Sequence, residues 1–204
     1  MTPSANPNPN PNPNPTAADA PARALSRVYI AASLDGYIAR EDGSLDWLMQ
    51  ANAAVPEGED CGYAQFMAGV DAIVMGRATF ETIAAFAQWP YGDTPVIVMS
   101  RSGWRAPVIA GASISVSDET PDALLRRLGA AGLARVYLDG GRLIQSFLEA
   151  GVVDEITVTT IPRLLGRGRP LFGALAGDVP LVLVGSRSWP FGFVQSTWRV
   201  GAQA

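Results

Sequence analysis

A glycine and an arginine stand between an apolar run and a helix-forming segment in residues 71–79, a combination that suits phosphate binding. The run DAIVM ends at Gly76-Arg77, and the residues from Thr79 onward have helix character. A helix N-terminus presents unpaired N–H groups, glycine lets an anion approach the backbone, and arginine adds a forked donor for phosphate. We therefore predict a phosphate site here, with a plain turn at Gly76 and a solvated Arg77 as the alternative.

Paired glycines follow a second apolar run. Residues 135–138 lead into Asp139-Gly140-Gly141-Arg142, and a helix with an apolar face follows directly. Adjacent glycines allow unusual torsions and leave no side chain between the backbone and a ligand. The segment is not a G-x-G-x-x-G pattern, so a simple turn is the alternative. Together with the first loop, it would fit the two ends of a long dinucleotide.

Hydroxyl groups flank an arginine after a third apolar run, at residues 94–99. Ser100, Arg101 and Ser102 offer two hydroxyls around one guanidinium. This chemistry suits a ribose 2′-phosphate and favours NADPH over NADH. An ordinary polar loop is the alternative.

Small residues end a fourth apolar run, RVYIAAS, at residues 27–33, and the turn pair Asp35-Gly36 comes next. Small side chains at a strand end would let a flat ring pack closely against the backbone. Asp35 itself is more typical of a turn.

The composition excludes several classes of chemistry. The chain has no histidine, which removes Ser-His-Asp and Cys-His catalysis, and Cys61 is its single cysteine, which leaves no internal disulfide and no metal-binding spacing. The net charge of −4 and the lack of a basic block argue against nucleic acid. No run approaches the roughly 20 apolar residues that cross a bilayer. We expect a small-molecule partner, no metal, no membrane and a cytoplasmic location.

The elements that position these loops alternate between strands and helices. This order predicts one α/β domain over residues 25–204, a three-layer sandwich whose mixed, mostly parallel sheet ends in an antiparallel hairpin around Pro190-Phe191-Gly192. Residues 1–24, an Asn-Pro repeat followed by small residues, predict a disordered tail. Ligands of such sheets bind at the carboxyl ends of the strands. The predicted strands are 27–33, 71–75, 94–99, 135–138, 155–161, 181–188 and 193–200, and the predicted helices are 60–68, 79–87, 120–128 and a stripe from 143 that ends at Gly151.

In this order, the loops resemble those of the dihydrofolate reductase-like superfamily. The matching stretches are AASLDGYIA, DAIVMGRATFE, PVIVMSRS and VYLDGGRLIQSFLEAGVVDEITVTTIPRLLGRGRPLF. The longest is similar to the reductase domain of bifunctional riboflavin-biosynthesis enzymes and to its stand-alone relatives, and the resemblance covers about residues 27–200. It implies an NADPH-dependent reductase that transfers hydride to a C=N or C=O group of a small pterin-, pyrimidine- or sugar-derived substrate. The closer relatives also imply a homodimer.

The resemblance also implies a set of cofactor-binding residues. It places Gly76, Arg77 and Thr79 at the pyrophosphate and 2′-phosphate side, and Ser100 and Arg101 near the adenosine phosphate. Gly140, Gly141, Arg142 and Leu143 would lie along the central cofactor backbone, and Ala32 and Ile38 would border the nicotinamide.

Asp60 is the catalytic carboxylate that the resemblance implies, by counting back without gaps from DAIVMGR. A carboxylate partly buried beside a ring nitrogen would have a raised pKa and could supply or relay the proton that accompanies hydride addition. Asp60 could instead only start a helix, and Asp46 in LDWL is a second candidate. Tyr37, Trp47, Tyr63 and Phe66 could line the acceptor pocket or belong to the core.

The substrate is less defined than the cofactor. Residues 41–60 lack the proline-flanked tryptophan pattern that wraps the pterin in dihydrofolate reductases, which argues against folate specificity. Folate reduction and pyrimidine reduction stay open as distinct options. Arg167 and Arg169 could bind a substrate phosphate or lie at a subunit contact. A non-catalytic ligand-binding or regulatory protein on the same fold is the alternative to an enzyme.

Overall fold

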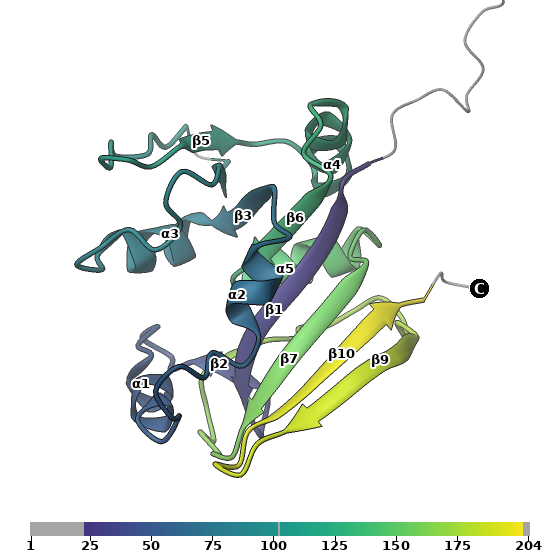
Figure 1. The fold of residues 1–204 in the computed structure, drawn as a ribbon. Coiled ribbons are helices and arrows are strands. Elements are labelled where there is room, and N and C mark those ends of the chain that lie inside the picture. The colour runs from purple at the N-terminus through teal and green to yellow at the C-terminus, as the bar shows by residue number, and fades with distance from the viewer. Residues whose placement is uncertain (1–22, 102, 202–204) are drawn as a thin grey trace, which may run out of the picture.

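A computed structural model describes residues 23–101 and 103–201 as one eight-stranded sheet with helices on both faces (Figure 1). Residues 1–22 of the predicted tail and Ser102 lie outside the described residues. The six central and left-hand strands run parallel, and the last two form an antiparallel hairpin, as predicted. In spatial order the strands are β5 (Ile114–Ser117), β4 (Val96–Met99), β3 (Ala72–Gly76), β6 (Arg135–Asp139), β1 (Leu25–Ser33), β7 (Glu155–Ile161), β10 (Val194–Val200) and β9 (Leu181–Ser188).

The central strands β3, β4 and β6 are buried except at their ends. Such continuous apolar runs are expected where helices cover both faces of a parallel sheet. One face carries α1 (Asp46–Asn52), α2 (Tyr63–Met67) and α3 (Arg77–Ala84), and the other carries α4 (Pro121–Ala130) and α5 (Gly141–Glu149). Three layers result, and the α/β sandwich is confirmed.

Each face of the sheet has its own apolar core. Phe66 of α2 and Phe80 of α3 pack over alternate residues of β3, β4 and β6, in a cluster with Ile73, Met75, Val96, Val98 and Tyr137. The helices α4 and α5 pack over the opposite set, in a cluster that includes Val28, Val74, Leu124, Leu128, Leu138, Ile144 and Phe147. This alternation follows from the two-residue period of a strand.

Two helix starts differ from the prediction. The helix α3 begins at Arg77, with Gly76 in an extended conformation as its N-cap, so Thr79 lies inside the helix and does not open it. The helix α2 begins at Tyr63, after Gly62, whose φ of 88° cannot belong to a right-handed helix. The predicted start at Asp60 was therefore wrong. By contrast, the predicted start at Thr120 is confirmed, because its side chain accepts from the N–H of Ala123.

Several short elements were not predicted. The helix α1 lies within residues 41–59, where we predicted no helix, and β5 has alternating small polar residues without a clear apolar run. A separate two-stranded ribbon joins β2 (Tyr37–Ala39) to β8 (Arg169–Pro170). Over residues 23–101 and 103–201, we find no helix with the length and apolarity that a bilayer crossing requires, and no group of three or more potential metal-binding side chains.

Candidate functional site

The strand ends that the sequence singled out lie side by side at one edge of the sheet. The order β4, β3, β6, β1 makes the four strands neighbours, and their parallel register pairs Met99 with Gly76 and Met75 with Asp139. The loops that begin at Ser100, Gly76, Gly140 and Leu34 therefore leave the same edge. This is the carboxyl edge, where open α/β sheets bind their ligands.

The paired glycines lie where a side chain would not fit. Gly140 has a φ of 99°, and a β-carbon there would overlap with the hydroxyl oxygen of Thr79. A β-carbon on Gly141 would come within 2.9 Å of Cδ1 of Ile38 and 3.0 Å of the carbonyl oxygen of Pro170. The structure thus brings Thr79, Gly140, Gly141 and Ile38, all predicted cofactor-binding residues, into one contact group.

Two helices begin at this edge without a side-chain cap. Gly76 is the N-cap of α3 and Gly140 is the N-cap of α5, and neither helix start receives a side-chain hydrogen bond. A β-carbon at Gly76 would meet nothing within 4 Å, so the backbone there is open to a ligand. Unpaired N–H groups and the positive end of the helix dipole favour an anion at each start.

The other predicted cofactor-binding residues surround these two helix starts. Ala32 and Leu143 are buried, Ser100 is half-buried, and Arg101 and Arg142 are exposed. Arg77 is exposed, forms an ion pair with Glu81 at 2.7 Å and lies over the ring of Trp104 at 5.8 Å. A phosphate would have to compete with Glu81 for this guanidinium, and such an exposed pair contributes little to stability.

Asp60 is not the partly buried acid that we expected. Its side chain is exposed, and its two oxygens accept hydrogen bonds from the N–H groups of Gly62 and Ala64, each at 2.8 Å. The bond from Ala64 and then that from Gly62 lower the pKa of Asp60. The expected raised pKa was wrong, because a carboxylate that caps backbone donors is stabilised in its charged form.

Asp139 has the environment that we had expected of Asp60. It ends β6 directly before the paired glycines and has the hydroxyl of Tyr91 at 3.4 Å from its Oδ2. Burial raises its pKa to about 6, although its hydrogen bonds oppose the shift. From the sequence we had named Asp139 only as part of the glycine loop and had predicted no role for it. A carboxylate at the end of a buried strand, next to a predicted ligand loop, was the signal in the sequence.

A cavity of about 660 Å³ lies on the face of the sheet that α1 and α2 cover. Tyr29 and Ala31 of β1 and Thr159 of β7 form its floor, and residues 55–61 form one wall. The strand β6 pairs with β1 up to Leu138 and Val28, so the next residues, Asp139 and Tyr29, are neighbours across the sheet; Tyr29 lines the cavity, and Asp139 does not. Tyr63 lines the cavity, and its pKa of about 12 results from burial and then from the charge of Asp139.

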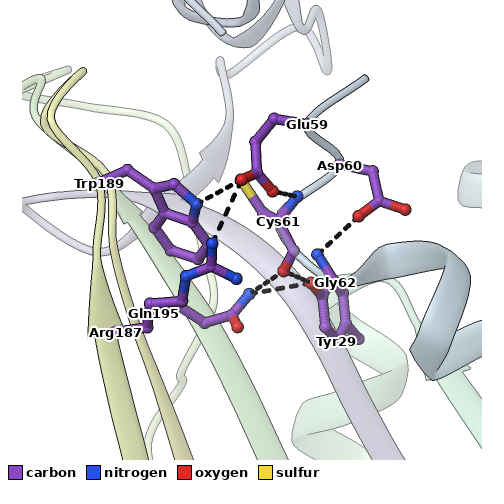
Figure 2. Close-up of polar contacts among 8 residues, drawn as sticks. All are labelled: Tyr29, Glu59, Asp60, Cys61, Gly62, Arg187, Trp189 and Gln195. Atoms are coloured by element: carbon purple, nitrogen blue, oxygen red, sulfur yellow. Dashed lines mark hydrogen bonds and ion pairs between the residues drawn. The ribbon is translucent and has the colours of Figure 1, made fainter. Parts of the chain in front are cut away.

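Hydrogen bonds fix the wall of the cavity to the sheet, as Figure 2 shows. The carbonyl oxygen of Cys61 accepts from the hydroxyl of Tyr29 at 2.5 Å and from the amide of Gln195 at 3.1 Å. Glu59 accepts from the indole N–H of Trp189 at 2.9 Å and from Arg187 at 3.3 Å. Residues far apart in the sequence thus hold residues 59–61 in place.

The remaining candidate residues contact other parts of the protein and do not line the cavity. Asp46 forms an ion pair with Arg40 at 2.6 Å, and Asp35 accepts from the N–H groups of Leu165 and Gly166. Trp47 and Phe66 are buried in the core. Neither Arg167 nor Arg169 lines the cavity, and Arg169 donates to the carbonyl oxygen of Glu41 at 3.3 Å.

Comparisons with known proteins agree with this architecture. The family model described as RibD C-terminal domain matches residues 27–192. The uncharacterised Bacillus subtilis (strain 168) protein YwjB is 34% identical over 165 residues, which are 79% of this chain and 90% of YwjB. A crystal structure from Shewanella sp. PV-4, assigned to riboflavin biosynthesis, is 34% identical with a TM-score of 0.77 and covers 87% of this chain and 99% of its own.

Two more distant structures show the fold alone. The Thermotoga maritima diaminohydroxyphosphoribosylaminopyrimidine deaminase/5-amino-6-(5-phosphoribosylamino)uracil reductase is 16% identical with a TM-score of 0.69, covering 88% of this chain and 57% of its own. An Enterococcus faecalis dihydrofolate reductase complexed with NADP(H) is 17% identical with a TM-score of 0.55, covering 88% of this chain and 97% of its own. The sheet is therefore of the dihydrofolate reductase type.

Proposed function

Since the chain belongs to the RibD C-terminal domain family, we propose that it is an NADPH-dependent reductase that passes hydride to a C=N or C=O group of a small heterocyclic or sugar-derived substrate. One observation carries the proposal. Two helix starts without side-chain caps and a glycine pair that admits no β-carbon lie at the carboxyl edge of four adjacent parallel strands.

The residues at this edge fit a phosphorylated dinucleotide. The start of α5 at Gly140 would hold the pyrophosphate through its backbone N–H groups. Arg77, Ser100 and Arg101 would bind the phosphates of the adenosine half, and a 2′-phosphate there would distinguish NADPH from NADH. Ala32, near the carboxyl end of β1, and Ile38, which a β-carbon on Gly141 would meet, would border the nicotinamide.

The acceptor would occupy the cavity beside β1. NADPH supplies hydride from C4 of its nicotinamide when it is bound. The protein would align the acceptor at about 3 to 3.5 Å from this atom and exclude water from the site. The ionised carboxylate of Asp60 lines the cavity, where it can accept a hydrogen bond from an N–H group of the acceptor and orient it.

Asp139 is our candidate for the proton donor. Addition of hydride to a C=N or C=O group leaves negative charge on nitrogen or oxygen, and a proton must neutralise it. A pKa of about 6 keeps part of the Asp139 population protonated near neutral pH, as general acid catalysis requires. Tyr63, which lines the cavity, has its pKa raised by burial and then by the charge of Asp139, and so keeps its hydroxyl proton for hydrogen bonding.

A screen for NADPH oxidation tests the proposal. Pterin-, pyrimidine- and sugar-derived acceptors are supplied one at a time with NADPH, and loss of its absorbance is followed. Turnover of any acceptor, with transfer of deuterium from C4-labelled NADPH into the product, supports the reductase. If NADPH binds but no acceptor is reduced, the chain is a dinucleotide-binding protein on a reductase fold.

We also propose that two copies pair through β9. All eight residues of this edge strand are exposed, and four of them, Leu181, Val182, Leu183 and Val184, are apolar and between 41% and 55% exposed. A long apolar edge strand with unpaired backbone groups is a template for another strand. A second copy related by two-fold symmetry would place β9 antiparallel to its own equivalent and cover both strands.

A further inference from the structure

We propose that the cavity beside β1 admits an uncharged or cationic heterocycle and excludes acceptors that carry a phosphate group. This inference rests on the proposed reductase, because it names the class of acceptor that the same site takes. It concerns the charges around the cavity, whereas the cofactor proposal concerns the glycine loops at the strand ends.

The inner walls of the cavity suit a flat, largely apolar molecule. Leu48, Val55, Ile161 and Phe193 contribute aliphatic and aromatic surface, and Tyr29 contributes a ring. The volume of about 660 Å³ falls within the range of pockets that enclose small organic ligands. Thr159, whose hydroxyl oxygen accepts from the side-chain amide of Gln195 at 2.8 Å, adds a polar group on the floor.

Three carboxylates and no basic side chain line this cavity in the part of the chain that the structure describes. Glu57, Glu59 and Asp60 all line it, and among the described residues that do so none is basic. The sequence has no lysine and no histidine that could supply a positive charge. Hydrogen bonds lower the pKa of Glu59, chiefly that from Trp189, and backbone hydrogen bonds lower the pKa of Asp60. Both carboxylates are therefore ionised at neutral pH.

Three arginines outside the lining of the cavity already have partners. Arg187 forms an ion pair with Glu59 at 3.3 Å and lies over the ring of Trp189 at 4.5 Å (Figure 2). Arg163 donates to the side chain of Gln50 at 2.9 Å, and Arg169 donates to the carbonyl oxygen of Glu41. A phosphate that entered the cavity would meet Glu57 and Asp60 without a counter-ion.

Electrostatics then sets the preference of the cavity. A phosphate ester would lose its hydration and approach carboxylates of the same charge. A neutral ring would lose little hydration free energy, and a protonated ring nitrogen would be attracted by the carboxylates. Discrimination by an unfavourable charge is a common route to specificity. The geometry thus separates this chain from a reductase that must hold a phosphorylated ribosyl group in the same place.

Riboflavin and FMN are a suitable pair of probes, because they share the same heterocycle and polyol and differ only in the terminal phosphate. Quenching of flavin fluorescence gives the dissociation constant of each, with and without NADP⁺ to occupy the cofactor site. We expect riboflavin to bind at least about tenfold more tightly than FMN. Glu57→Arg should reduce this ratio by about fivefold, mainly through tighter FMN binding.

Glu57 is a clean position for this test because its side chain is exposed and has no hydrogen bond or ion pair in the described structure. Glu149→Arg is the matched control: it makes the same charge change on α5, which covers the opposite face of the sheet, and should leave the ratio unchanged. The inference would be overturned if the two flavins bound equally tightly, if FMN bound more tightly than riboflavin, or if neither flavin bound. It would also be overturned if Glu57→Arg left the ratio of the two dissociation constants unchanged.

The same data separate this inference from the proposed function. If the chain binds NADPH but binds the two flavins equally tightly, only the proposed charge preference of the cavity is contradicted. A chain that discriminates between the flavins, responds to Glu57→Arg and binds no NADPH keeps the cavity as a ligand site and loses the reductase.

Discussion

Gly140 lies directly against Thr79, so close that a β-carbon on the glycine would overlap with the hydroxyl oxygen of the threonine. This contact joins the turn after β6 to the first turns of α3, and so it couples the two helix starts that we assign to the cofactor. The left-handed torsion of Gly140 and the contact together make glycine necessary at this position.

We predict that Gly140→Ala destabilises the protein by about 2 to 4 kcal/mol, since strain at a positive φ adds to the overlap with Thr79. The change also displaces Thr79 and weakens NADPH binding. Gly151→Ala is the control, because Gly151 also has a positive φ but a β-carbon there meets nothing within 4 Å. Urea unfolding compares the two variants, and equal losses of stability would show that the contact is unimportant.

The pKa of Asp139 predicts a specific dependence of stability on pH. The folded-state pKa of Asp139, about 6, lies above its ordinary value. Its contribution to the free energy of unfolding is therefore fully present below about pH 4 and is lost as the pH rises through 6. Asp139→Asn removes this dependence. Relative to the wild type, the variant should gain up to about 3 kcal/mol in free energy of unfolding between about pH 4 and pH 7.5. If the difference in free energy of unfolding between the variant and the wild type stayed constant over this range, the pKa of Asp139 would not lie near 6.

Turnover distinguishes Asp139 from Asp60. If Asp139 donates the proton, kcat/KM of the wild type falls as the pH rises through about 6, and Asp139→Asn lowers turnover by about 100-fold and removes this limb. Asp60→Asn should slow turnover or raise KM for the acceptor, leave the position of the limb unchanged and leave NADPH affinity nearly unchanged. A full rate and an unchanged pH profile in Asp139→Asn would exclude it as the donor.

The exposed apolar residues of β9 predict a dimer that one charge can disrupt. Leu183→Arg, at a side chain that is 51% exposed, should convert a dimer to a monomer in sedimentation-velocity experiments without loss of fold. Val116→Arg makes the same kind of change on β5, the opposite edge strand, and should leave the dimer intact. A wild-type protein that stays monomeric at high micromolar concentration would refute the pairing.

The sequence predicted the elements with a clear period and missed those without one. The strand β7 and the hairpin of β9 and β10 lie almost where we predicted them, because each strand runs for seven or eight residues. The helix α1 and the ribbon of β2 and β8 are too short to show a period. Strand order is a further limit, since nothing local places β6 between β3 and β1.

For the candidate site too, the sequence predicted some features and missed others. Loops that follow apolar strands could be found from glycines and helix starts, and the structure brings Thr79, Gly140 and Gly141 together. The exposure of Asp60 depends on the turn at Gly62, and the raised pKa of Asp139 depends on burial among Tyr63, Tyr91 and Tyr137. These neighbours come from separate parts of the chain, so local sequence could not reveal them.

The central claim is that this sheet edge binds NADPH, and a fluorescence titration tests it most directly. The five tryptophans act as energy donors to the reduced nicotinamide, and NADPH and NADH are titrated in parallel. We predict tighter binding of NADPH, with Arg77→Ala and Arg101→Ala each weakening it by about tenfold, as expected for loss of a charged phosphate contact. Arg199→Ala, an exposed arginine on β10, is the control and should leave it unchanged. If neither dinucleotide binds at concentrations up to about 1 mM, the affinity is too weak for a cofactor site and the proposed reductase is contradicted.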